Sequence, residues 1–295
     1  MLKQGYRYKW MRHEIARLDP FVDAPRIIHL HLNSTLPASA MLNNLIYTLG
    51  LVRLCASREQ AIPVHRDGKG KVYRKGDQRA DETNVHLLMW LDRDLSDPAI
   101  RESLAHVRHL HGVIARKWPM RKEAFLHALA SFTLLLDRFR TRVLGAPPVN
   151  EQVRHALVHQ FVQIGEMLGI DHIPPTWEGM EGYLEAYEDS VHLGYSEEGA
   201  AVANALINQF VSRWLPRGLR QTGRKVIIGL LEAPIADALR LPRPGRILTR
   251  AAHTAIRALL FARCYLLPDP RRGVHFSDIT ASHPRSALPK CPVPH

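Results

Sequence analysis

Three histidines fall within six positions of the segment ESLAHVRHLHGVIARKW, residues 102–118. At 100° per residue, His111 shares a helix face with the apolar side chains of this segment, while His109 and His106 lie about 160° and about 140° away. We therefore expect His106 and His109 to be solvated and His111 to occupy a core position. The apolar stripe comprises Ile100, Leu104, Val107, Leu110 and Ile114.

Burial disfavours a charged imidazole, so the chemistry expected of His111 is that of a neutral ring. The ordinary interpretation is a hydrogen bond to a backbone carbonyl or a side-chain acceptor, and the alternative is ligation of a metal or cofactor. Arg108 lies within about 60° of the same face. It is either an ion-pair partner at the edge of the core or a partner for an anionic group such as a carboxylate or propionate.

A second polar set precedes this segment in KGDQRADETNVHLLMWL, residues 75–91. Its members recur at helical spacing and share one face: Arg79, Glu82, Thr83 and His86. The pattern is typical of the amphipathic start of a helix, where acidic residues are favoured by the helix dipole. An apolar segment follows at once, which also suits the rim of a cavity.

Several other kinds of site are not supported. The GxSxG, HExxH and glycine-rich phosphate motifs are absent. His155 and His159 are four apart, but the paired ExxH motifs of a di-iron bundle are missing. The three cysteines are scattered and favour reduced thiols in a cytoplasmic-type compartment: Cys55, Cys264 and Cys291. Without CxxC or CxxCH, the sequence does not support a zinc ribbon or covalent haem.

The elements that must position these residues are helices, because apolar residues recur at three and four positions along almost the whole chain. The predicted helices are 9–18, 21–33, 37–57, 79–93, 98–117, 121–144, 149–169, 176–192, 197–214, 218–239 and 246–266. Residues 27–52 carry no charged side chain but include histidines, asparagines and a proline, so buried helices around a turn are expected instead of a membrane span.

We predict one all-α domain over residues 1–267 and a proline-rich extended tail over 268–295, with a polar loop at 62–78. The first twenty residues have no apolar segment typical of a secretory signal, so a cytoplasmic protein is expected.

The net charge of +12 is concentrated in residues 213–272, where thirteen Lys or Arg stand against three acids. This basic stretch is either a solvated face or a surface that associates peripherally with an anionic membrane. Nucleic acid is not expected as a partner, because no aromatic residues interleave with the arginines to stack on bases.

The order of these features resembles that of the MpaB-type oxygenase family, which is related to the latex clearing proteins. Arg79-x3-Thr83 comes first, and Arg108-His-Leu-His111 follows about twenty-eight residues later. EMLGIDHIPPTWEGMEGYLEAYE, residues 166–188, then supplies a glycine turn, a proline and an aromatic-acidic helix.

This resemblance extends roughly from Leu18 to Arg272. It implies a globin-like, multi-helix domain around a pocket that binds haem b non-covalently. It also implies a haem-dependent oxygenase that uses dioxygen and a hydrophobic small molecule, with oxidative cleavage of isoprenoid C=C bonds as the reaction. Tyr187 and Glu188 match a motif with a structural role.

The resemblance also assigns roles to the polar residues. His111 matches the proximal ligand of the iron, and Arg108 is the arginine of the histidine motif. Arg79 and Thr83 match distal polar residues that donate hydrogen bonds to bound oxygen or orient a propionate. Glu82 stands where latex clearing proteins carry a lysine, so lysine ligation does not carry over, and Glu82 is instead a candidate for proton transfer.

The rival hypothesis is a haem-free helical protein that binds lipids or an anionic surface. In that protein His111 would be a core residue satisfied by hydrogen bonding.

Overall fold

The computed structural model of the chain describes residues 8–118, 120–190 and 192–288. No strand forms among these residues, and an isolated bridge joins Ser57 to Leu193, so the all-α class is confirmed. The helices, with π-helical (η1, η3) and 3-10 (η2) turns, are α1 (Trp10–Ile15), α2 (Ala24–Thr35), α3 (Ala40–Leu54), α4 (Arg58–His65), α5 (Lys71–Arg74), α6 (Gly76–Asp92), α7 (Pro98–Lys117), α8 (Lys122–Arg138), η1 (Phe139–Val143), α9 (Glu151–Leu168), α10 (Trp177–Glu188), α11 (Glu197–Trp214), η2 (Arg217–Leu219), α12 (Arg220–Gly229), α13 (Ala233–Ala238), α14 (Arg246–Phe261), η3 (Ala262–Leu266) and α15 (Phe276–Ser282). The globin-like arrangement stays a prediction.

Several helices begin and end at residues whose chemistry favours a boundary. Asp97 caps α7 by accepting a hydrogen bond from the Ala99 amide at 2.9 Å, and Pro98 follows at the first helical position. Asn150 caps α9 in the same way. Helix α9 ends at Gly169, whose φ of 77° is readily adopted only by glycine.

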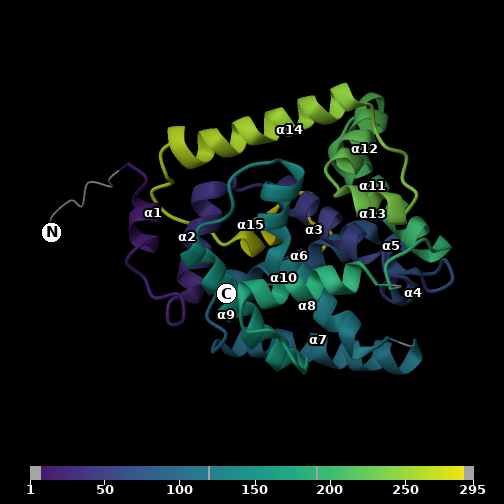
Figure 1. Cartoon of the computed structure of the whole chain (residues 1–295), viewed down its shortest axis with the longest axis horizontal. Helices are drawn as coiled ribbons and strands as arrows, with labels where there is room; N and C mark the ends of the chain where they lie inside the picture. Colours follow the sequence, from purple (N-terminus) through teal and green to yellow (C-terminus); the bar gives the residue numbers. More distant parts are fainter. Residues whose placement is uncertain (1–7, 119, 191, 289–295) are drawn as a thin grey trace.

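The helices pack around two apolar cores. The first lies mainly between α2, α6, α8, α9 and α10, and the second between α3, α11 and α12. Phe132 of α8 packs against both cores and so joins them. In Figure 1, α14 lies along one edge of the molecule and α7 along the opposite edge, with α8 and α10 between them.

The C-terminal region differs from the predicted extended tail. Residues 276–282 form α15, which packs against α6, and Phe276 at its start is buried in the first core. Asn43 of α3 also donates a hydrogen bond to the Phe276 carbonyl at 2.9 Å. The domain boundary at residue 267 stays a prediction, and residues 289–295, with Cys291, lie outside the described residues.

Two other stretches differ from prediction. The region predicted as a loop at 62–78 contains the end of α4, all of α5 and the start of α6. The predicted helix 218–239 is divided into η2, α12 and α13. Pro234, near the start of α13, has no backbone N–H and so cannot donate the hydrogen bond that would continue the preceding helix.

Residues 27–52 form most of α2 and α3, separated by a short turn, as predicted. Among the described residues, every helix is too short or too polar to cross a membrane.

Candidate functional site

Helices α6 and α7 carry the predicted site residues and meet at Ser103. The Ser103 hydroxyl accepts a hydrogen bond from Trp90 Nε1 at 2.9 Å and lies 2.7 Å from His86 Nδ1. The rings of His86 and His106 stack with centroids 6.4 Å apart. These pairs show that the two helices run in opposite directions from the short turn that joins them.

This antiparallel direction places the two predicted sets on the same side of the Ser103 contact. Going back along α6 leads to Thr83 and Arg79, and going forward along α7 leads to Arg108 and His111. Their side chains nevertheless contact different neighbours: Arg79 faces α3, whereas His111 faces α8.

Arg79 is half-buried, and its Nε atom is buried without a hydrogen-bond partner among the described residues. The guanidinium lies near Tyr47 and Cys55. Burial raises the pKa of the Tyr47 hydroxyl and that of the Cys55 thiol, the latter to about 12, and in both cases the charge of Arg79 opposes the shift. Arg79 therefore brings a donor with unused hydrogen-bonding capacity into a low-dielectric environment.

Glu82 and Thr83 are both half-buried on the same helix. Glu82 forms an ion pair with Lys71 of α5 and accepts a hydrogen bond from Gln78 Nε2 at 2.8 Å. Lys71 is a residue that sequence reasoning missed, because it was assigned to a loop.

His111 is half-buried, with its ring against Phe125 of α8 at a centroid distance of 5.1 Å. Burial lowers the pKa of its imidazole to about 4. The ring is therefore neutral near pH 7 and has a free lone pair. No hydrogen bond to this ring is found among the residues that the structure describes, so the expected carbonyl or acidic partner is not identified. His106 and His109 are exposed, as predicted.

The apolar stripe of α7 is buried only in its first half. Ile100 and Leu104 are 1% exposed, whereas Leu110 is 43% exposed. His111 is therefore half-buried and does not lie in the core position predicted for it. Leu110 and Val113 of the second half are exposed apolar side chains.

Arg108 is exposed, and its guanidinium packs against Gly169 at the end of α9, where an added Cβ would lie 3.1 Å from Arg108 Nε. A cation at a helix C-terminus is stabilised by the helix dipole. The end of α9 is therefore a structural partner for the Arg108 guanidinium. Arg108 also lies about one turn of α7 before His111.

A buried charge network was not predicted from the sequence. It joins Arg53 and Arg138 to Glu188 and Glu232, each side chain being at most 12% exposed. Arg138 Nη2 lies 3.1 Å from an oxygen of each carboxylate. Burial alone would raise the pKa of Glu188, but His127, whose Nε2 lies 3.7 Å from the carboxylate, and the charges of the two arginines lower it to about 2.

His127 extends this network toward α10. Gln60 Nε2 lies 2.7 Å from His127 Nδ1, and the ring stacks on Tyr187 at a centroid distance of 4.1 Å. The Tyr187 hydroxyl donates to Glu59 at 2.8 Å. Tyr187 and Glu188 therefore both contact members of this network.

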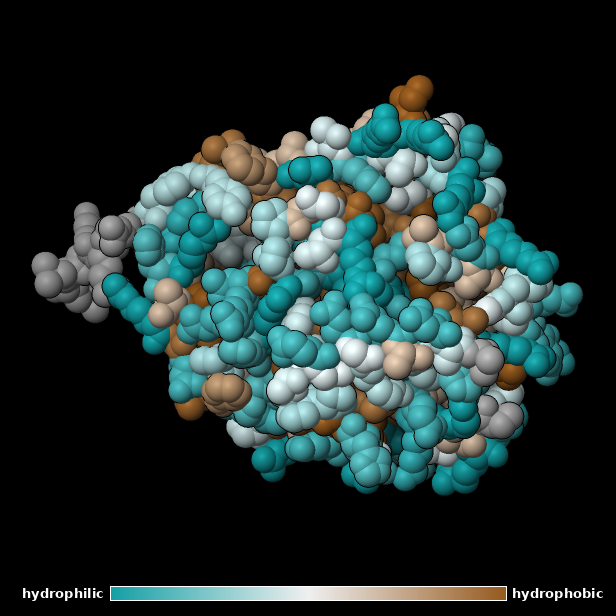
Figure 2. Space-filling view, in the orientation of Figure 1, coloured by the Kyte–Doolittle hydropathy of each residue, from teal (hydrophilic) through white to brown (hydrophobic). Residues whose placement is uncertain are grey.

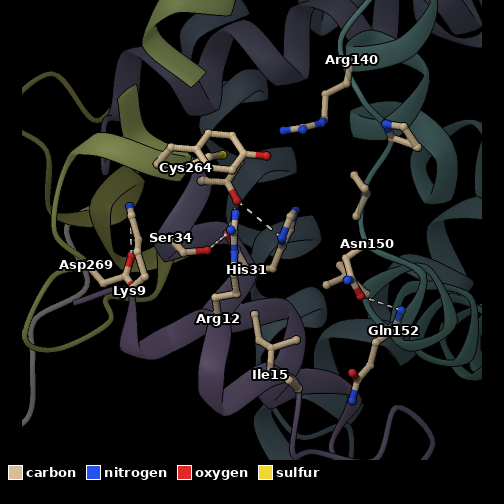
Figure 3. A pocket seen from close by; sticks show the side chains of 16 residues that line it. Lys9, Arg12, Ile15, His31, Ser34, Arg140, Asn150, Gln152, Cys264 and Asp269 are labelled. Carbon is tan, nitrogen blue, oxygen red and sulfur yellow. Dashed lines mark hydrogen bonds and ion pairs between the residues drawn. The ribbon is translucent and has the colours of Figure 1, made fainter. Parts of the chain in front are cut away.

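A separate cavity of about 380 Å³ opens between α1, α2, η3 and the start of α9 (Figure 3). Its lining carries three cationic side chains against one acid: Lys9, Arg12, Arg140 and Asp269. Burial first, and then the charges of Arg140 and Arg12, lower the pKa of His31 to about 4. The cavity suits an anionic group, and none of the predicted site residues lines it.

Comparison with known proteins places these helices in a family. A family model described as ER-bound oxygenase mpaB/B'/Rubber oxygenase, catalytic domain, matches residues 52–260. This span contains all five predicted site residues on α6 and α7. None of the curated proteins compared with the chain matches it.

Proposed function

Because the chain belongs to the ER-bound oxygenase mpaB/B'/rubber oxygenase catalytic-domain family, we propose that it is a haem b-dependent oxygenase acting on a hydrophobic substrate. The observation that carries the haem proposal is the half-buried, neutral imidazole of His111 without a hydrogen-bond partner among the described residues. A neutral imidazole nitrogen with a free lone pair is the usual protein ligand of haem iron.

The residues present fit this group. The Phe125 ring that packs against His111 offers apolar contact to a porphyrin, and the buried Arg79 Nε lacks a partner among the described residues. His111 would hold the iron without a covalent link to the porphyrin, and Arg108 or Arg79 would neutralise a propionate. Haem, when bound, supplies the dioxygen chemistry.

The other polar residues of α6 would handle charge and protons. Arg79 would donate a hydrogen bond where negative charge develops, and the Thr83 hydroxyl would orient a neighbouring polar group. Glu82 would hold or release a proton, with its carboxylate positioned by Lys71. The proposed reaction is oxidative cleavage of an isoprenoid double bond, on the basis of the rubber oxygenase name within the family description.

Substitution of Arg79 by glutamine is expected to lower turnover of an isoprenoid alkene by about 100-fold, because a preorganised donor to developing charge is worth about 10²–10³. Haem content should be retained, since His111 is unchanged. Turnover and the Soret band would be measured on the same sample. Exposed Arg74 of α5 provides the control, and Arg74→Gln should leave both unchanged. Wild-type turnover in Arg79→Gln would contradict the assigned role.

We further propose that α14 associates with an anionic membrane, where a hydrophobic substrate would partition. Figure 2 shows hydrophobic side chains at the edge of the molecule that α14 forms. Ile247 of this helix is 87% exposed, and no residue of α14 is buried. Arg250 and Arg257 add positive charge to the same helix. Arg243 precedes α14 and pairs with Asp237.

Binding to vesicles is expected to require anionic lipid and to weaken with salt. In co-sedimentation with phosphatidylcholine vesicles that do or do not contain phosphatidylglycerol, Ile247→Asp should weaken binding several-fold. Val22→Asp, at an exposed apolar position on the α1–α2 turn, is the matched control and should bind as the wild type does. Binding that is indifferent to lipid charge and to salt would exclude this association.

A second candidate function is a haem-free helical protein that binds an anionic lipid. The cavity that Lys9, Arg12 and Arg140 line favours it. An absorption spectrum after reconstitution with haem separates the candidates, because a colourless chain would leave only the binding function.

A further inference from the structure

Two histidines and an aspartate from distant parts of the chain come together at the end of α6. Asp92 is the last residue of α6, His29 lies in the middle of α2, and His275 immediately precedes α15. Asp92 Oδ2 lies 3.3 Å from His29 Nδ1 and 3.1 Å from His275 Nδ1. The two imidazole rings have centroids 4.7 Å apart.

These distances match those between ligands that share one metal ion. With metal–ligand distances of about 2.0–2.1 Å, neighbouring ligand atoms of a tetrahedral zinc site lie about 3.3 Å apart. One donor atom from each residue falls within 4.8 Å of the others. The three side chains therefore converge closely enough to bind one cation with only small side-chain rotations.

The cluster is incompletely satisfied by protein hydrogen bonds alone. Asp92 is buried, and its Oδ1 atom has no partner among the described residues. His275 Nδ1, although 3.1 Å from the carboxylate, is also buried without a hydrogen bond of acceptable geometry. Unpaired buried polar atoms are costly, and a cation between the donors would satisfy His275 Nδ1.

The backbone around His275 is fixed against α2. Asn33 donates to the Val274 carbonyl at 3.0 Å and accepts from the Val274 amide at 2.9 Å. Gly273 lies so close to His29 that an added Cβ would be 2.2 Å from His29 Nε2. The two histidines are thus held together by local packing as well as by Asp92.

This cluster is distinct from the proposed oxygenase site. Asp92 follows Arg79 by thirteen residues on one helix, a separation of about 20 Å along its axis. His29 and His275 also lie outside residues 52–260, the span that the family model matches. The cluster therefore includes residues that the family assignment does not cover.

We propose that His29, Asp92 and His275 bind a divalent first-row transition-metal cation. Two imidazoles and a carboxylate suit Zn²⁺, and the same donor set also binds Fe²⁺. The His275 side chain is 38% exposed, but its Nδ1 atom is buried. The ion links the segment before α15 to α2 and α6.

The test is a titration of the chelator-treated full chain with Zn²⁺ by calorimetry, and with Co²⁺ by visible absorption. We expect one site per chain that is absent from His275→Gln or at least about 100-fold weaker there, because even the outer hydrogen-bond partners of metal ligands are worth 10–100-fold. Exposed His13 provides the control, and His13→Gln should bind as the wild type does. Titration with Fe²⁺ under anaerobic conditions distinguishes the two ions.

His275→Cys keeps a ligand that Zn²⁺ favours, so it should restore binding if the glutamine variant is impaired only in coordination. Circular dichroism of each variant reports folding. The proposal is overturned if the wild type binds neither Zn²⁺ nor Fe²⁺ at micromolar concentrations, or if folded His275→Gln binds as tightly as the wild type. Because binding of added ion is measured directly, the result does not depend on whether the chain holds haem.

Discussion

Replacing His111 with alanine is expected to abolish the Soret band of the haem-reconstituted chain and to lower oxygenase turnover by at least about 100-fold, because the iron loses its protein ligand. The reason lies in the imidazole itself. Burial lowers its pKa to about 4, so the ring is neutral at physiological pH and its lone pair is available. Absorption after desalting, together with turnover of an isoprenoid alkene, measures both effects.

The control for this substitution is His109→Ala. His109 lies two residues earlier on the same helix and is exposed, so its removal tests for general damage to α7. The Soret band should survive in that variant. A band that persisted in His111→Ala would transfer the ligand role to another residue, with His86, His159 and Cys264 the next to test.

Glu188→Gln is expected to lower the free energy of unfolding by about 3–5 kcal/mol, because breaking a buried ion pair leaves a buried charge uncompensated. Glu188 pairs with Arg53 and Arg138, and both guanidinium groups are at most 7% exposed. Denaturant unfolding of the full chain would measure the change. The control is Glu185→Gln, which removes an exposed partner of Arg142 and should cost less than about 1 kcal/mol.

The same carboxylate predicts a dependence on pH. Its pKa is about 2 in the folded chain against an ordinary value of 4.5, so its contribution to stability is complete above pH 4.5 and is lost as the pH falls through 2. Glu188→Gln should therefore flatten the decline in stability over that interval. Equal pH profiles of stability for the wild type and the variant would contradict the assignment of this decline to Glu188.

Most helices could be predicted from the sequence because they are long enough to show the 3.6-residue period. The predicted 98–117 and 197–214 coincide with α7 and α11. The short helices α4, α5 and α15 were missed, since four to eight residues cannot show a clear period and their stability comes from packing. The burial of Phe276 against α6, for example, joins residues that are far apart in the sequence.

The candidate site was predictable to the extent that it depends on one helix at a time. Spacing separated His111 from exposed His106 and His109, and it placed Arg79, Glu82 and Thr83 together on α6. The pairing of Glu82 with Lys71 was not predictable, because it needs the intervening turn. Still less could the sequence bring together His29, Asp92 and His275, which depend on tertiary contacts between three separate elements.

The packing of α15 against α6 affects the order in which the chain can fold during synthesis. Helix α6 leaves the ribosome long before residues 276–282 exist, so part of its surface must wait for about 180 further residues to be made. At about 5–20 residues per second this interval lasts roughly ten to forty seconds. During that time the apolar surface that Phe276 later covers is open to chaperones and to neighbouring nascent chains.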